Sequence, residues 1–189
     1  MSDDVRQNFR RAVDEFGRRV HDMKDEQWQS PTPCAEWDVR ALVNHMLSEL
    51  LWMPPLYEGM TIAEVGAQFE GDVLGDHPVA AWDEGARKAV DAVDADSAME
   101  RAVHLSFGDT PGDEYARQVF ADLLIHGWDL ARGAGQDERL DPELVSACAS
   151  WFVDMESVYR DGGAIAARPE TPADADEQTK LLAAFGRKA

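Results

Sequence analysis

Cysteine is scarce in this sequence, and long apolar runs are missing from it. The two cysteines, Cys34 and Cys148, are too few and too far apart for a disulfide framework or a zinc-finger motif. We interpret both as thiols in a reducing compartment. A reactive Cys34 would need a neighbouring base, and no sequence feature identifies one. Because no apolar run could span a bilayer or serve as a secretory signal, we expect a cytoplasmic protein.

Basic side chains are also few. The 189 residues include 18 lysines and arginines against 37 aspartates and glutamates, a net charge of −19 that is spread along the chain. Such a surface repels phosphate backbones and anionic lipids, so we expect neither nucleic acid nor a membrane as partner. Phosphate-binding glycine loops, Gly-x-Ser-x-Gly and His-Glu-x-x-His are absent as well, which leaves nucleotide binding and acyl transfer without support.

Apolar residues recur at helical spacing in five long segments. We predict helices over residues 3–24, 39–52, 79–93, 114–132 and 142–159. Asp38 is a suitable N-cap for the second helix, and Pro54 with Pro55 is expected to end it. A short helix is predicted at 62–69, an extended segment at 102–107, and a turn at 108–112.

This pattern predicts an all-α protein, an antiparallel four-helix bundle with an additional C-terminal helix and one short extended segment. We expect the bundle to occupy residues 1–160. Residues 161–189, which contain a short apolar patch near their end, are expected to form a tail that packs on the bundle. Apolar helix faces left exposed would allow a homodimer, although the pattern does not identify such a face.

Three polar residues lie within apolar helix stripes. His45 is on the second predicted helix, and Asp122 and His126 are one turn apart on the fourth. An (i, i+4) pair places both side chains on one face, roughly 5–6 Å apart at Cβ. A carboxylate among leucines needs a compensating charge, and a metal ion would supply it. Two imidazoles and one carboxylate suit zinc, with nickel or ferrous iron as alternatives, and they leave coordination positions open.

The same spacing also fits a surface pair or a buried histidine that is satisfied by hydrogen bonds. Glu49 and Asp129 lie close to the two histidines in helical terms, and either could orient an imidazole or simply face solvent. Asp129 is also a candidate base. Three tryptophans are predicted to wall a pocket near the ligands: Trp37, Trp52 and Trp128.

Three segments resemble a known family. They are PTPCAEWDVRALVNHM (31–46), ADLLIHGWDLARGAG (121–135) and LLAAFGR (181–187). In these motifs the chain is similar to an actinobacterial family of metal-binding proteins related to the N-terminal domain of mycothiol-dependent maleylpyruvate isomerase, within the DinB-like superfamily.

The resemblance implies a DinB-type bundle that holds a divalent metal through His45 and an acidic-x-x-x-His pair, here Asp122 and His126. The family usually has glutamate where this chain has Asp122, and the shorter side chain reduces its reach to the metal. The resemblance also implies a thiol cofactor, mycothiol, whose pKa the metal lowers. The activity expected by analogy is a metal- and thiol-dependent transferase or isomerase acting on a small electrophile. The alternative is a non-catalytic module that binds a metal or a small ligand, and a purely structural bundle ranks below both.

Overall fold

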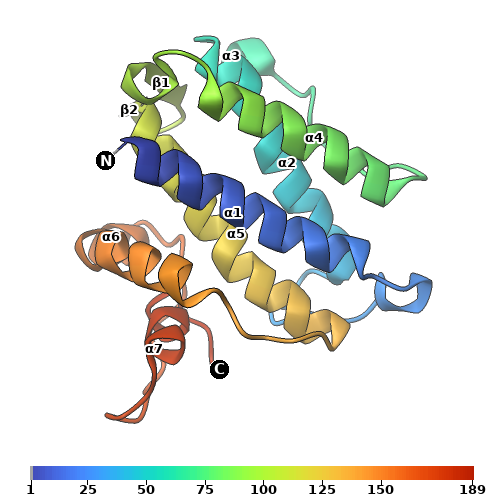
Figure 1. Ribbon diagram of the computed structural model, residues 1–189, viewed down its shortest axis with the longest axis vertical. Helices are drawn as coiled ribbons and strands as arrows, with labels where there is room; N and C mark the ends of the chain where they lie inside the picture. Colours follow the sequence, from blue (N-terminus) through green and yellow to red (C-terminus); the bar gives the residue numbers. More distant parts are fainter. Residues whose placement is uncertain (1) are drawn as a thin grey trace. The chain divides into compact units, whose positions relative to one another are not determined.

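The computed structural model describes residues 2–189, and most of them are helical (Figure 1). Its α-helices are α1 (Ser2–His21), α2 (Val39–Tyr57), α3 (Ile62–Val65), α4 (Pro78–Asp94), α5 (Gly112–Ala134), α6 (Pro142–Asp161) and α7 (Glu177–Ala184). Two 3-10 turns, Asp25–Gln27 and Ala98–Glu100, and two strands, β1 (Ala102–Leu105) and β2 (Gly108–Pro111), complete it. Within residues 2–189, no helix combines the length and apolar character needed to cross a membrane. The chain divides into two compact units, Met1–Gln136 and Asp137–Ala189.

The first unit is built from the four long helices that the apolar periodicity predicts. α1 packs against α4 and α5, and α2 packs against the same two helices (Figure 1). Aromatic side chains fill the space between α1 and α4, where the rings of Phe16 and Trp82 stack with centroids 4.6 Å apart. Both rings are almost fully buried, and burial of such large apolar surfaces is the main source of stability in this unit.

The second helix begins as predicted and ends later than predicted. The Asp38 carboxylate accepts a hydrogen bond of 2.8 Å from the Ala41 amide and so caps α2. The expectation that Pro54 and Pro55 end the helix is wrong, because α2 continues through both to Tyr57. Two prolines remove only two amide donors from the last turn, and burial of the Met53, Leu56 and Tyr57 side chains on that turn offsets this loss.

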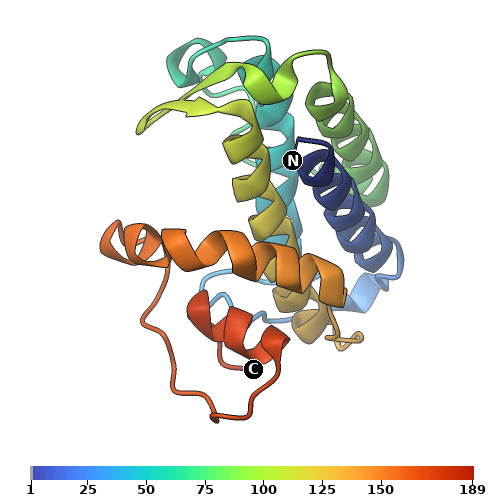
Figure 2. The same cartoon turned by 60° about the vertical axis from the view of Figure 1, so that its left-hand side comes forward.

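A β-hairpin connects the α4 side of the unit to α5 (Figure 2). β1 and β2 pair in antiparallel register, with Val103 opposite Thr110 and Leu105 opposite Gly108. The predicted extended segment is therefore present, but the turn predicted at 108–112 is wrong, because most of it forms β2. The reversal occurs at Ser106 and Phe107, just before Gly108, whose φ of +130° requires glycine.

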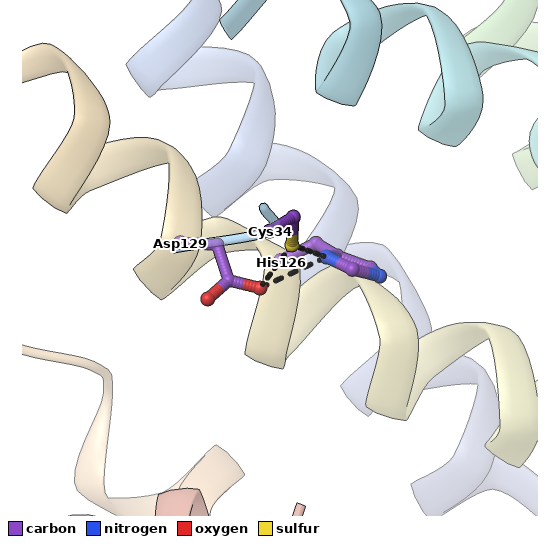
Figure 3. A group of neighbouring side chains, drawn as sticks. All are labelled: Cys34, His126 and Asp129. Carbon is purple, nitrogen blue, oxygen red and sulfur yellow. Dashed lines mark hydrogen bonds and ion pairs between the residues drawn. The ribbon is translucent and has the colours of Figure 1, made fainter. Parts of the chain in front are cut away.

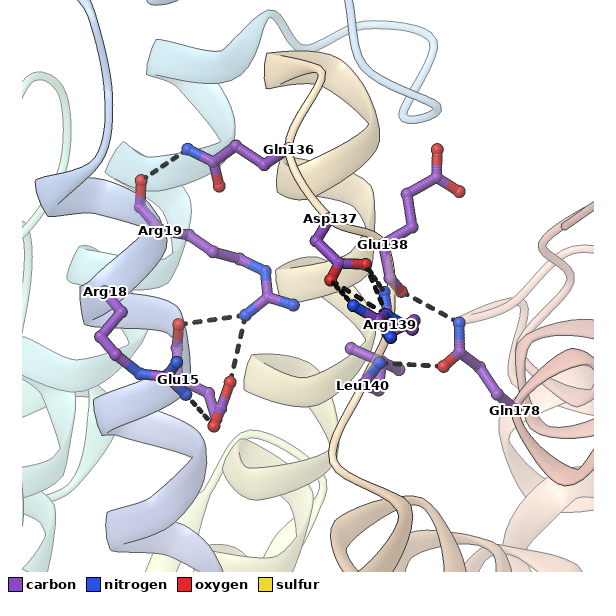
Figure 4. A network of polar contacts seen from close by, with 9 residues as sticks. All are labelled: Glu15, Arg18, Arg19, Gln136, Asp137, Glu138, Arg139, Leu140 and Gln178. Atoms are coloured by element: carbon purple, nitrogen blue, oxygen red, sulfur yellow. Dashed lines mark hydrogen bonds and ion pairs between the residues drawn. The ribbon is translucent and has the colours of Figure 1, made fainter.

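The fifth helix is closed at its C-terminal end by local and long-range contacts. Gly135 adopts the left-handed conformation with φ 65°, and its amide donates to carbonyls of the last helical turn. The Gln136 side-chain amide then donates to the Arg19 carbonyl at 3.0 Å, which ties the segment after α5 to α1 (Figure 4). On α1, Glu15 pairs with both Arg18 and Arg19.

The second unit contains α6 and α7. The rings of Phe152 and Phe185 stack at 3.8 Å between centroids, and Gln178 bonds to the Leu140 amide at 2.9 Å and the Glu138 carbonyl at 3.0 Å (Figure 4). The apolar patch predicted near the C-terminus thus belongs to a short helix. The boundary between the units differs from the division expected at residue 160, because α6 packs its apolar face against α7.

Gly112, at the start of α5, leaves no room for a side chain. A Cβ there would overlap the Ala98 carbonyl oxygen, whereas a Cβ at Gly127 would meet only Phe16 Cδ2 at 3.7 Å. We expect Gly112→Ala to lower the free energy of unfolding by about 2 kcal/mol through overpacking. Gly127→Ala, in the same helix, is expected to be neutral or to stabilise by up to about 1 kcal/mol. Thermal unfolding followed by circular dichroism checks both, and equal losses would contradict this packing.

Candidate metal centre

Two helices and the loop before α2 bring three aromatic rings together. His45 lies on α2 and His126 on α5, and their ring centroids are 5.5 Å apart in an edge-to-face arrangement. The Trp37 ring, from the loop, lies 4.5 Å from the His45 ring and 5.9 Å from the His126 ring. The structure therefore places the two sequence-predicted histidines next to each other, with one of the predicted tryptophans beside both.

Asp129 holds the His126 ring in place. The two residues are three positions apart on α5, so their side chains share a face, and Nδ1 of His126 lies 3.0 Å from Oδ2 of Asp129. Asp129 is fully buried, and an ionised carboxylate only accepts, so the imidazole donates its Nδ1–H. Figure 3 shows that the other ring nitrogen, Nε2, points away from Asp129. This is the arrangement expected of a carboxylate that orients a metal-binding imidazole.

Cys34 also reaches this cluster, a contact that the sequence reasoning missed. Its Sγ donates to Oδ2 of Asp129 at 3.4 Å and lies 3.9 Å from Nδ1 of His126 (Figure 3). The loop that carries Cys34 is shaped by Thr32, whose hydroxyl donates to the Trp37 carbonyl at 2.7 Å and accepts from the Cys34 amide at 3.1 Å. The ligand atoms of Cys34, His126 and Asp129 lie within 4.8 Å of one another, so these residues form a possible metal-binding group.

Glu49 lies one helical turn from His45 on α2, and Asp122 lies one helical turn from His126 on α5. Both line a pocket of about 290 Å³ between α2, α5 and the hairpin. The other lining residues are Trp52, Leu56, Ile62, Leu105, Ser106, Phe107, Tyr115, Gln118 and Val119. The structure thus connects the predicted ligand Asp122, the predicted auxiliary residue Glu49 and one predicted tryptophan to a single cavity.

The remaining predicted tryptophan lies elsewhere. Trp128 is buried in the core, where the Arg132 guanidinium covers its ring at 4.2 Å from the centroid. It is not among the residues that line the pocket. Its role in the described part of the chain is therefore packing and a cation–π contact, in contrast to Trp37 and Trp52.

Burial and neighbouring charges separate the pKa values of the site residues. Burial, and then the charge of His126, lower the pKa of His45 to about 4. Burial also acts to lower the pKa of His126, but its hydrogen bonds with Asp129 and Cys34 and the charge of Asp122 outweigh this effect and raise the pKa to about 9. Burial and the Asp122 charge raise the pKa of Glu49 to about 7. Near neutral pH the site therefore contains a neutral His45 beside a cationic His126.

Among the described residues, one group brings its ligand atoms within 4.8 Å of one another, and it comprises Cys34, Asp129 and Nδ1 of His126. His45 lies beside the His126 ring and Asp122 is one helical turn from it, but these three residues are not brought that close together. Neither ring nitrogen of His45 forms a hydrogen bond with any residue in the described range 2–189. A half-buried imidazole with a free lone pair, next to a second imidazole, suits a divalent metal such as zinc. The residues present therefore fit a metal ion.

Comparison with known proteins places the site residues in a shared region. The family described as mycothiol maleylpyruvate isomerase N-terminal domain matches residues 9–131, which include Cys34, His45, Asp122, His126 and Asp129. Two relatives from Mycobacterium tuberculosis, both named as uncharacterized proteins, come from strains CDC 1551 / Oshkosh and ATCC 25618 / H37Rv. Each is 30% identical over 134 residues, which is 71% of this chain and 69% of the relative. No solved structure matches the chain.

The raised pKa of Glu49 predicts a pH-dependent stability. Because the folded chain binds this proton more tightly than the unfolded chain does, stability falls as pH rises from about 4.5 to about 7. We expect metal-free Glu49→Gln to match the parent at pH 4.5 and to exceed it above pH 7, by at most about 3 kcal/mol.

Urea unfolding at both pH values, in the presence of a chelator, measures this difference. Glu36→Gln, which changes an exposed glutamate of the loop before α2, is the matched control and is expected to show no such trend. A Glu49→Gln effect that is the same at both pH values would contradict the assignment.

Proposed function

Because this chain belongs to the mycothiol maleylpyruvate isomerase N-terminal domain family, we propose that it binds one divalent metal ion through His45, Asp122 and Nε2 of His126. The observation that carries the proposal is the imidazole pair: His45 has no hydrogen-bond partner in residues 2–189 and lies edge-on to His126 at 5.5 Å. Asp122, one helical turn from His126, supplies the carboxylate. The four long helices α1, α2, α4 and α5 would then form a DinB-type bundle around the site.

The hydrogen bond from His126 to Asp129 favours metal binding through Nε2 of His126 over metal binding through Nδ1 with Cys34 and Asp129. It occupies Nδ1 and leaves Nε2 on the side away from Asp129 (Figure 3). Metal-binding histidines in proteins usually donate their second ring nitrogen to a carboxylate in this way. Two histidines and one carboxylate also leave a coordination position open, as catalytic zinc sites do. Zinc is the metal we favour, with nickel or ferrous iron as alternatives.

We further propose that the protein is a metal- and thiol-dependent transferase or isomerase acting on a small electrophile. When bound, the metal would lower the pKa of a thiol such as mycothiol so that the thiolate can attack. The pocket beside Asp122 would bind the electrophile, and Glu49, which lines it, would accept or return a proton at its carboxylate. Trp37 would shield the two imidazoles from water, and Asp129 would keep the His126 ring in its orientation.

A second candidate is a non-catalytic metal-binding module. The observation that favours it is the cluster of Cys34, His126 and Asp129, whose ligand atoms already lie within 4.8 Å. In this arrangement the metal would use Nδ1, and the pocket at Asp122 would not be connected to it. The two candidates differ in which variants lose the metal.

Metal content separates them. We expect purified His45→Ala and His126→Ala to lose at least 90% of the bound metal (about a tenfold drop in occupancy, ~1.4 kcal/mol or more). Cys34→Ser is expected to retain it. His104→Ala, which removes an exposed hairpin histidine paired with Asp109, is the control. Elemental analysis of each variant, with circular dichroism to confirm folding, is the measurement. Loss of metal from Cys34→Ser together with retention in His45→Ala would reject the proposed donor set.

Metal binding should also release a proton. His126 carries a proton at pH 8 because its pKa is raised to about 9, and Nε2 must lose that proton to bind a metal. We expect release of about one proton per zinc ion at pH 8, falling toward zero above pH 10. Calorimetric titration with zinc in two buffers of different ionisation enthalpy measures it. A binding enthalpy that does not depend on the buffer at pH 8 would contradict coordination through Nε2.

A further inference from the structure

The pocket that contains Glu49 and Asp122 is also lined by Tyr115. Tyr115 on α5 is only 5% exposed, and its hydroxyl forms no hydrogen bond with residues 2–189. The neighbouring Tyr57, whose ring centroid is 5.7 Å away, donates its hydroxyl to the Gly112 carbonyl at 2.7 Å. Tyr115 lines the cavity, and its hydroxyl can therefore donate a hydrogen bond to a ligand or a water molecule.

Two other polar side chains share this property. Gln118 and Trp52 line the same cavity, and neither side chain forms a hydrogen bond within the described residues. Three side chains that carry hydrogen-bond donors, from α2 and α5, therefore line one pocket. A cavity with a few convergent polar groups is the usual form of a small-molecule site.

The walls of the pocket are apolar and partly flat. Trp52 forms one side, and Leu56, Ile62 and Val119 contribute aliphatic surface. Phe107, at the reversal of the hairpin, also lines the pocket and is 73% exposed. A ligand that covers the exposed Phe107 ring removes apolar surface from water, which is favourable. A ligand with a planar apolar body would cover this ring best.

The charges of the pocket restrict the ligand further. Its lining residues include two carboxyl groups, Glu49 and Asp122, and no lysine, arginine or histidine. A carboxylate of the ligand would contact no cation among the lining residues and would face two acidic groups in a partly desolvated space. With a volume of about 290 Å³, the pocket is at the small end of ligand sites and suits a single-ring compound.

We propose that this pocket binds an uncharged, planar apolar molecule through one carbonyl-type oxygen, which accepts the Tyr115 hydroxyl hydrogen. This inference rests on the proposed function and adds to it the class of substrate that the enzyme would take. A negatively charged group of a ligand would face Glu49 and Asp122 in this pocket, so the pocket disfavours carboxylates. Tyr115 is accordingly a specificity-determining residue.

Acetophenone and benzoate test this proposal, because they share a ring and differ mainly in charge. Full-length protein is titrated with each by ligand-detected NMR, both as purified and after treatment with a chelator. In the chelated protein, where benzoate has no metal to contact, we expect acetophenone to bind at least tenfold more tightly. Equal binding, tighter benzoate binding, or no binding of acetophenone would overturn the inference.

Two variants test the assigned contacts. Tyr115→Phe removes only the hydroxyl, and we expect it to weaken acetophenone binding about five- to tenfold. Tyr159→Phe, in the second unit, is the matched control and should leave binding unchanged. Glu49→Gln removes one acidic group and is expected to improve benzoate binding relative to acetophenone. The proposal is rejected if Tyr115→Phe does not weaken acetophenone binding. It is also rejected if Glu49→Gln does not change the ratio of the benzoate and acetophenone affinities.

The result is separable from the metal assignment. Metal content measured on the same preparations tests the proposed function, whereas the preference between the two probes is measured without metal. If the protein contains no metal but prefers acetophenone, the proposed metal site is refuted and the proposed ligand class is supported. If the protein contains metal but shows no preference for acetophenone, the metal site is supported and the ligand class is refuted.

Discussion

The hydrogen bond between His126 and Asp129 is the interaction on which the site depends. Asp129 is fully buried, and a carboxylate in that position must be paired. The partner lies three residues away on α5, so the pairing requires only that this stretch be helical and buried. Its consequence is to give the His126 ring two distinct sides. Nδ1 faces Asp129 and Cys34, and Nε2 is directed away from them (Figure 3).

Because its ring has these two sides, His126 interacts both with Cys34 and Asp129 and with the carboxyl groups of the pocket. The Cys34 thiol approaches from the loop before α2 and bonds to the same carboxylate oxygen as His126. The charge of Asp122 raises the pKa of both His126 and Glu49, and the charge of His126 acts to lower the pKa of Glu49. The His126 imidazole thus lies between the pair formed by the half-buried Cys34 and the buried Asp129 and the two carboxyl groups of the pocket, which is a suitable place for a cation.

Much of the fold could be predicted from the sequence, because four long amphipathic helices follow from apolar periodicity alone. The errors fall where packing overrides local preference. α2 passes through Pro54 and Pro55 because the last turn buries its side chains, and the residues from Gly108 form a strand because β1 lies beside them. His45 and His126 were identifiable from their stripes and motif. Cys34 was not, because its contacts to α5 join residues more than ninety positions apart in the chain.

The sequence by itself determined what depends on neighbours along the chain: the helical segments, the cap at Asp38, and the shared face of Asp122, His126 and Asp129. The tertiary structure decided which side of His126 meets which partner, because the approach of α2 and its preceding loop to α5 sets those distances. It also decided the charge state of Glu49, since burial and the nearby Asp122 charge raise the pKa of this carboxyl group. The spacing of residues along the chain does not show which side chains are removed from water, and this desolvation shifts the pKa values of the site residues.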